Sequence, residues 1–161
     1  MSPLGAPREP LLLIYATAII ALMLTVVPLP SYAAVFRPVF LAIVILYWST
    51  MTPQAGGILL GFLFGLLLDA VKGVQLGQHA LAMSFLAYLA IRLHLMTRAK
   101  PLFQQCLFVA IAMVLYETLL WAIDGWSGRP MHSPTRWAHA ITDAMLWPVV
   151  AGLLGRTHGS R

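Results

Sequence analysis

Five ionisable side chains in this sequence have the types and positions to form a polar pocket inside an otherwise apolar chain. They are Asp69, His79, Glu117, His139 and Asp143. His139 and Asp143 are four residues apart, so on a helix they share one face. Charged groups inside a bilayer are costly and need partners or a wet cavity. Such a set either forms an outward-facing pocket or proton path, or it pairs structurally at helix ends, and the sequence leaves both interpretations open.

Other chemistries find little support in these residues. No serine lies in a nucleophile-elbow pattern, and no His-Glu-x-x-His segment is present. The histidines lack metal-ligand spacing, and Cys106 is the only cysteine, which excludes an internal disulfide and a thiolate cage. The basic residues never form a run, as a nucleic-acid groove would require. We therefore expect no enzyme, no cofactor, no metal and no nucleic-acid partner.

The composition indicates that the elements positioning these side chains lie in a membrane. Of the 161 residues, 60% are hydrophobic and 9% are charged. Soluble domains have about 45–50% apolar and about 25% charged residues. A water-soluble protein needs more charge than this to cover its surface, and a disordered chain contains far less apolar sequence. The chain is therefore expected to be a polytopic membrane protein.

Six apolar segments approach the length of a transmembrane helix. We expect spans at residues 11–29, 36–51, 54–71, 76–95, 102–123 and 137–155, within a single integral-membrane domain over residues 1–161. The fold class is accordingly an all-α membrane protein, with six transmembrane helices in one compact bundle. The first segment is not expected to be a signal peptide, because its basic start is weak (Arg8, offset by Glu9), it is too long, and it lacks a small-x-small cleavage site. The tryptophans fall mostly near predicted span ends, as interfacial aromatics do: Trp48, Trp121, Trp126, Trp137 and Trp147.

Basic residues favour an orientation with both termini in the cytoplasm, because lysine and arginine accumulate on the cytoplasmic side. With six spans, the side of the termini carries Arg8, Arg92, Arg98, Lys100, Arg156 and Arg161, and the other side carries Arg37, Lys72, Arg129 and Arg136. In this topology the five pocket residues, together with Asp124, fall in the half of the membrane opposite the termini. The polar pocket would then face away from the cytoplasm.

Small residues recur at every fourth position in the third predicted span. Gly57, Gly61 and Gly65 have this spacing, and Asp69 and Gly73 continue it. Small residues at this period let another helix approach closely. The stripe therefore either packs inside the bundle or forms a docking face for a helix of a partner protein.

Asp69 ends this stripe, at the C-terminal end of a helix, where the helix dipole disfavours negative charge. The start of the next span, near Gly77, offers backbone N–H groups without intrahelical partners. We expect Asp69 to bind them and so to tie the hairpin of spans three and four. Asp69→Asn should then be milder than Asp69→Leu.

Several blocks of the chain, in order, give it a resemblance to the bacterial rod shape-determining protein MreD family. The blocks include Val35-Phe36-Arg37-Pro38, Leu46-Tyr47-Trp48, Pro53, Gly61, Gly65, Leu66 to Asp69, Gly73, Leu76-Gly77, Leu81 to Ser84, Tyr88, Gln104-Gln105 and Leu146-Trp147-Pro148. Of these residues, the family motif is assigned to Arg37, Pro38, Trp48, Pro53, Asp69, Gly77, Trp147 and Pro148. The size, the six spans and the short loops are also similar to that family.

The resemblance implies a non-catalytic subunit of the bacterial cell-elongation machinery, placed in the inner membrane as a multi-pass protein. Its implied partners are a bitopic MreC-like protein and, in a larger complex, an MreB-like filament and the enzymes of peptidoglycan synthesis. Membrane lipid and a second copy of the chain are further expected partners. The family is also similar in architecture to the substrate-binding subunits of energy-coupling-factor transporters. A small-molecule-binding transporter subunit is therefore the alternative function, and an intramembrane enzyme would need a constellation that is missing.

Overall fold

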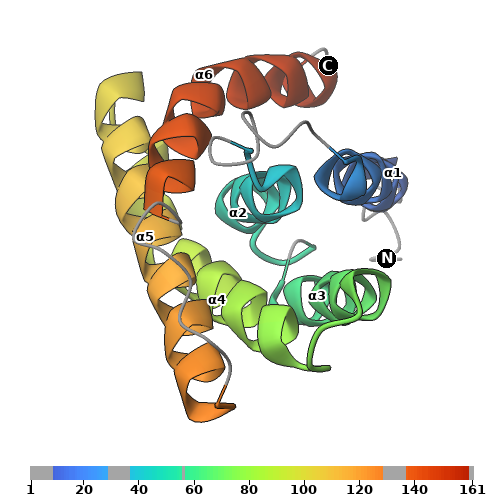
Figure 1. The fold of residues 1–161 in the computed structure, drawn as a ribbon. Coiled ribbons are helices and arrows are strands. Elements are labelled where there is room, and N and C mark those ends of the chain that lie inside the picture. Colours follow the sequence, from blue (N-terminus) through green and yellow to red (C-terminus); the bar gives the residue numbers. More distant parts are fainter. Residues whose placement is uncertain (1–8, 29–36, 56, 129–136, 160–161) are drawn as a thin grey trace.

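The six described helices pack around one of their number, α2. The computed structural model describes residues 9–28, 37–55, 57–128 and 137–159, and these contain no β-strand. The helices are α1 (Glu9–Val26), α2 (Phe40–Met51), α3 (Ile58–Lys72), α4 (Gln78–Arg98), α5 (Leu102–Trp126) and α6 (Ala138–Gly159). In Figure 1, α1, α3, α4 and α6 surround α2, and α5 lies outside α4 and α6. The expectation of an all-helical bundle is thereby confirmed.

Helix α2 is buried along its length because the other helices cover it on every side. All ten residues from Leu41 to Thr50 are buried. Its 12 residues span only about 18 Å at 1.5 Å per residue, whereas the bilayer core is about 30 Å thick. A helix that meets protein rather than lipid can be this short, because its ends are solvated by neighbouring polar groups rather than by hydrocarbon.

Three of the described helices are long and apolar enough to cross a membrane by themselves. They are Gln78–Arg98, Leu102–Trp126 and the Ala138–Arg156 part of α6. Shorter apolar helices occupy Leu11–Val26 and Phe40–Met51. The described chain thus has the character of a membrane-embedded bundle in which long outer helices accompany shorter ones.

The helices differ from the predicted spans at their ends. Helix α3 begins at Ile58 rather than at residue 54, because the chain first turns after Pro53, with a hydrogen bond from Ala55 N to Thr52 O. Helix α4 continues through Arg98, since nothing stops it before Pro101. Asp124 likewise lies within α5 rather than after it. The predicted first and last residues at positions 29 and 36 lie outside the described residues.

For two tryptophans, Trp48 and Trp147, the expected position at the membrane interface is wrong, because both are buried in the core. Trp48 and Trp147 have no exposed surface. Trp48 Nε1 donates to Thr17 Oγ1 at 3.0 Å, and Trp147 Nε1 donates to Gln105 Oε1 at 3.1 Å. A buried indole needs such an acceptor for its N–H, so both rings belong to the core. Trp126, by contrast, is 95% exposed at the end of α5.

Candidate functional site

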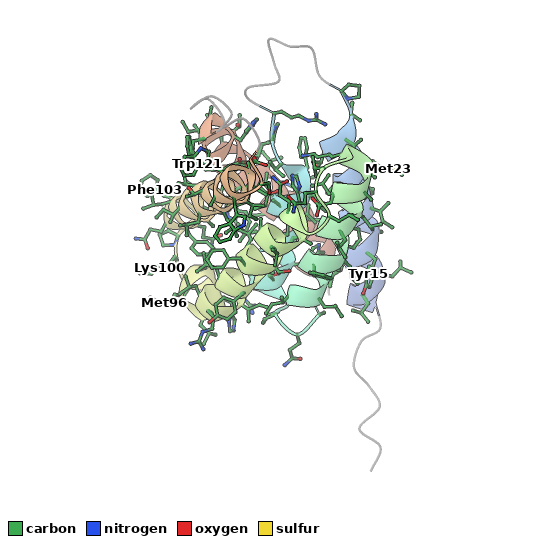
Figure 2. All side chains as sticks on the ribbon, turned by 60° about the horizontal axis from the view of Figure 1, so that its bottom comes forward. Tyr15, Met23, Met96, Lys100, Phe103 and Trp121 are labelled. Carbon is green, nitrogen blue, oxygen red and sulfur yellow. The ribbon has the colours of Figure 1, made fainter. Side chains whose placement is uncertain are left out.

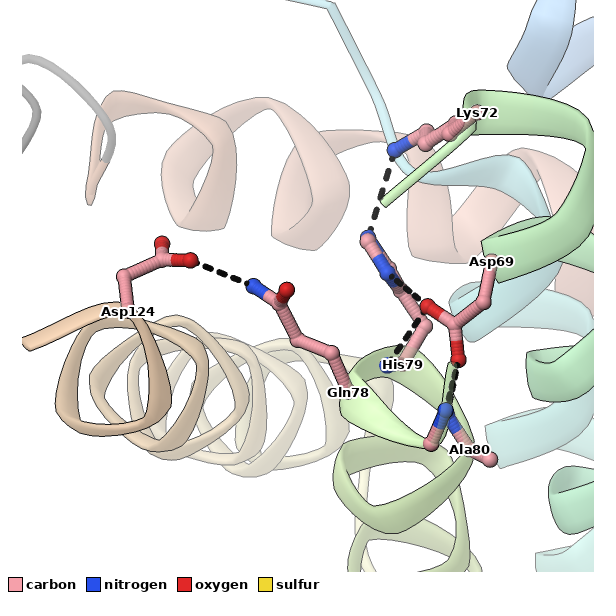
Figure 3. Close-up of polar contacts among 7 residues, drawn as sticks. Asp69, Lys72, Gln78, His79, Ala80 and Asp124 are labelled. Carbon is pink, nitrogen blue, oxygen red and sulfur yellow. Dashed lines mark hydrogen bonds and ion pairs between the residues drawn. The ribbon is translucent and has the colours of Figure 1, made fainter. Parts of the chain in front are cut away.

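The polar side chains gather at the end of the bundle where α3 turns into α4, and Asp69 is their best-connected member. Its Oδ2 accepts from the backbone N–H groups of Gly77 at 2.9 Å and Ala80 at 3.3 Å. Its Oδ1 accepts from His79 N at 3.0 Å and lies 2.7 Å from His79 Nδ1 (Figure 3). Asp69 has no exposed surface. One carboxylate of α3 therefore caps the first turn of α4, which has no side-chain cap of its own.

Glycine backbone geometry makes this cap possible. Gly73 ends α3 in the left-handed region, with φ 63°, and Gly77 precedes α4 with φ 100°. Gly73 N bonds to Ala70 O, and Val74 N bonds to Asp69 O, which is the pattern of a Schellman motif. Both glycines adopt conformations that other residues rarely accept, so the chain reverses within a few residues and brings the start of α4 to Asp69.

Two further contacts extend the network from His79 and its neighbour. Lys72 Nζ lies 3.3 Å from His79 Nε2, on the side of the ring opposite Asp69. This arrangement suits an imidazole that donates through Nδ1 to Asp69 and accepts at Nε2 from Lys72. Gln78 Nε2 donates to Asp124 Oδ1 at 2.8 Å, which joins α4 to α5 (Figure 3). Asp124, a buried side chain, thus takes part in the network alongside the predicted pocket residues.

The start of α2 is capped in the same way by side chains of other helices. Val39 N donates to Asp143 Oδ1 of α6 at 2.9 Å, and Leu41 N donates to Thr25 Oγ1 of α1 at 3.0 Å. The Arg37 guanidinium donates to Thr25 O at the end of α1. Asp143 is fully buried, and its second oxygen has no hydrogen bond within the described part of the chain.

A cavity of about 250 Å³ lies among these groups. Three predicted pocket residues line it: His79, Glu117 and His139. The other lining residues are Thr25, Arg37, Pro38, Val39, Lys72, Tyr116 and Leu120. Asp69 and Asp143 do not line it but bind the backbone at the starts of α4 and α2. The cavity therefore combines two basic side chains, Arg37 and Lys72, with one buried carboxyl group and two imidazoles, a set that suits a small polar molecule or water.

The glycines of the stripe differ in their surroundings: two pack tightly against α4, and two lie at the ends of α3. A Cβ on Gly61 would lie 2.8 Å from Met83 O, and one on Gly65 would lie 2.4 Å from Ala80 Cα. Both glycines therefore face the backbone of α4 at very close range. Gly57 and Gly73 lie at the two ends of α3, where a Cβ would meet no side chain or backbone closer than 3.9 Å. The face of α3 formed by Gly61 and Gly65 is occupied within this chain.

The family-motif residues are spread over the fold rather than gathered in one site. Arg37 and Pro38 line the cavity, and Gly77 and Asp69 make the hairpin cap. Trp48 and Trp147 belong to the core, Pro53 follows α2, and Pro148 lies inside α6. Val35 and Phe36 lie outside the described residues.

Thr25 and Gln105 were not predicted as site residues. Thr25 caps α2, and Gln105 joins Trp147 to the turn before α5, because its Nε2 donates to Lys100 O at 2.9 Å. A glutamine inside an apolar helix was the available signal for Gln105. Thr25 gave no comparable signal, since threonine in an apolar helix usually bonds its own backbone, as Thr25 also does with Ala21 O. Among the described residues, no group of three or more His, Cys, Asp or Glu side chains is placed to hold a metal ion.

Comparisons with known proteins identify one family that the chain resembles over most of its length. The family model described as rod shape-determining protein MreD matches residues 9–157. The rod shape-determining protein MreD of Haemophilus influenzae is 29% identical over 132 residues, which are 82% of this chain and 82% of that protein. No solved structure matches the chain. The match of the family model over nearly all of the sequence, on a bundle of apolar helices, means that the chain belongs to the MreD family of rod shape-determining membrane proteins.

Proposed function

We propose that this protein is a non-catalytic inner-membrane subunit of the cell-elongation machinery, which binds an MreC-like bitopic protein and supports lateral peptidoglycan synthesis. The family membership over residues 9–157 is the observation that carries this proposal. An MreB-like filament and the wall-synthesis enzymes are the further members of the proposed complex. The whole chain, residues 1–161, acts as a single integral-membrane domain in this proposal.

The polar network fits the needs of such a scaffold. Asp69 binds three backbone N–H groups at the start of α4, Asp143 binds one backbone N–H just before α2, and Gln78 binds Asp124 across α4 and α5. These contacts satisfy helix starts that lipid cannot solvate, and so they hold the helices in one arrangement. We assign these side chains to rigidity of the bundle, which presents a constant surface to the partner.

In this proposal Gly61 and Gly65 affect partner binding indirectly, because they fix how α3 packs against α4. Their close contact with α4 leaves no room there for a helix of another protein. The partner then contacts outward-facing side chains of the bundle. Tyr15 and Met23 on α1 are examples of side chains that point outward, as Figure 2 shows.

The first prediction concerns cell shape. Depletion of this protein from a rod-shaped host is expected to give round, widening cells, because lateral wall synthesis would lose a subunit. Cell width is measured by microscopy as the protein is depleted, with plasmid-borne wild-type protein as the control. Rods of normal width after complete depletion, in a host without a second copy of the gene, would rule out the proposed function.

The second prediction concerns orientation. Arg92 and Arg98 lie in the last turns of α4 and Lys100 lies in the turn before α5, whereas the polar cavity lies at the opposite ends of these helices. We therefore place both termini in the cytoplasm. A fusion of alkaline phosphatase after Arg161 is expected to be inactive, and the same enzyme inserted between Gly73 and Val74 is expected to be active. Strong activity of the Arg161 fusion would show that the orientation is the reverse of the proposed one, with the polar cavity facing the cytoplasm.

A second candidate function is supported by the cavity itself. A space of about 250 Å³ lined by Arg37, Lys72 and Glu117 would suit a small zwitterion, and the unbonded oxygen of Asp143 is a further buried acceptor nearby in the network. The chain would then be the small-molecule-binding membrane subunit of a transporter, similar in architecture to those of energy-coupling-factor transporters. A vitamin-uptake defect on depletion, without rounding, would favour this function over the scaffold.

A further inference from the structure

An apolar groove lies at the other end of the bundle, between the end of α4 and the start of α5. It encloses about 460 Å³ and is lined by Leu93, Met96, Thr97, Lys100, Phe103, Gln104, Leu107 and Phe108. Met96 and Phe103 are 64% and 80% exposed. Figure 2 shows Met96, Lys100 and Phe103 on the same outer edge of the molecule, with Tyr15 and Met23 on the opposite side. Large apolar side chains on this edge thus flank a single lysine.

The turn that carries Lys100 is held in place by the core. Lys100 N donates to Thr97 O at 3.2 Å, and Gln105 Nε2 donates to Lys100 O at 2.9 Å. The other amide atom of Gln105, Oε1, accepts from Trp147, which is fully buried. The backbone at Lys100 is therefore fixed relative to α6 as well as to α4 and α5. The Lys100 side chain consequently extends from a fixed point beside the groove.

The charges around the groove have one sign. Arg92 and Arg98 are exposed on the last turns of α4, and Lys100 follows them. Of the acidic residues in the described chain, Asp69, Glu117, Asp124 and Asp143 all belong to the polar network at the opposite end, and Glu9 begins α1. The groove therefore opens beside Lys100, with Arg92 and Arg98 on the neighbouring turns of α4, while the four acids of the polar network lie at the opposite end of the bundle.

We propose that this groove is a binding site for an anionic phospholipid. An acyl chain lies along Met96, Phe103 and Leu107, and the headgroup phosphate lies beside Lys100. Basic positions at the ends of membrane helices attract anionic headgroups, whereas an apolar wall alone would accept any lipid equally. An apolar helix of a partner protein would bury the lysine without an acid to pair with it, whereas an anionic headgroup supplies the opposite charge.

The experiment is a competition for binding in solution. The full-length protein, purified in mild detergent, is mixed with equal amounts of phosphatidylglycerol and phosphatidylcholine of identical acyl chains, and the bound lipid is counted by native mass spectrometry. The wild-type protein is expected to retain more phosphatidylglycerol, and Lys100→Gln is expected to reduce this preference about fivefold, as one cation at a headgroup implies. Arg156→Gln is the matched control, because it removes an exposed charge of α6 that does not line the groove.

Phe103→Ala tests the apolar wall separately from the charge. This side chain is so exposed that its loss leaves the core intact, and it is expected to lower retention of both lipids together. Equal retention of the two lipids by the wild-type protein, or an unchanged preference in Lys100→Gln, would overturn the proposal. Loss of an MreC-like partner from Phe103→Ala, with lipid retention unaltered, would assign the groove to a protein instead. Each outcome is independent of the cell-shape experiment.

Discussion

Gly65→Leu is expected to prevent α3 from packing against α4, and Gly65→Ala is expected to destabilise the same contact. A Cβ at position 65 would lie 2.4 Å from Ala80 Cα and 2.6 Å from Ala80 N. These are backbone atoms, so no side-chain rotation relieves the clash, and the two helices must move apart. Overpacking of a core commonly costs about 1–3 kcal/mol, and a backbone collision lies at the upper end of this range or beyond it.

The measurement for Gly65 is the yield of monodisperse protein in detergent together with its thermal unfolding midpoint. Gly152 supplies a matched control, because it is also a glycine within a helix, and a Cβ there would meet nothing within 4 Å. Gly152→Ala and Gly152→Leu are expected to behave like the wild-type protein. If Gly65→Leu unfolded at the same temperature as Gly152→Leu, the close approach of α3 and α4 would not contribute to stability.

The same substitutions separate two roles of the glycine stripe. If the stripe only packs inside the bundle, Gly65→Ala should lose its MreC-like partner in proportion to the loss of folded protein. Co-purification is therefore normalised to the amount of monodisperse protein. If fully folded Gly65→Ala lost its partner, the result would show that the stripe is a docking face for the partner.

The sequence predicts the helical class and the number of apolar segments well, but it does not predict which helix lies in the centre. In a soluble protein, burial is visible because the outer faces of helices are polar. In a membrane protein, lipid and core are both apolar, so the pattern of α2 does not distinguish it from a lipid-facing span. The ten consecutive buried residues from Leu41 to Thr50 emerge only from the packing. The same ambiguity led Trp48 and Trp147 to be assigned to the interface.

Polar contacts could be predicted only where the partners lie close in the sequence. Asp69 and Gly77 are separated by a short turn, so a carboxylate at one helix end and free N–H groups at the next helix start are necessarily neighbours. Asp143 and Val39 are 104 positions apart, and their contact depends on how α6 packs against α2. No local pattern carries that information. Both contacts nevertheless meet the same physical need, since unsatisfied N–H groups are costly in a membrane.

The cap that Asp69 provides is expected to make this residue one of the most sensitive positions in the chain. Both carboxylate oxygens accept: Oδ2 from Gly77 N and Ala80 N, and Oδ1 from His79 N and the His79 ring. Asp69→Leu would leave all three backbone N–H groups without an acceptor in a buried site. Each such group costs about 1–3 kcal/mol, so the expected destabilisation is several kcal/mol.

Asp69→Asn is expected to be milder but still damaging, because the amide keeps one accepting oxygen and replaces the other with a donor. Whichever way the amide turns, its NH₂ group faces at least one backbone N–H at the start of α4, that of Gly77, His79 or Ala80. One lost acceptor corresponds to about 1–3 kcal/mol. Thermal unfolding midpoints in detergent should therefore fall in the order wild type, Asp69→Asn, Asp69→Leu. Equal midpoints for the two variants would mean that the negative charge matters more than the hydrogen bonds, and wild-type midpoints for both would show that the cap does not hold the hairpin together.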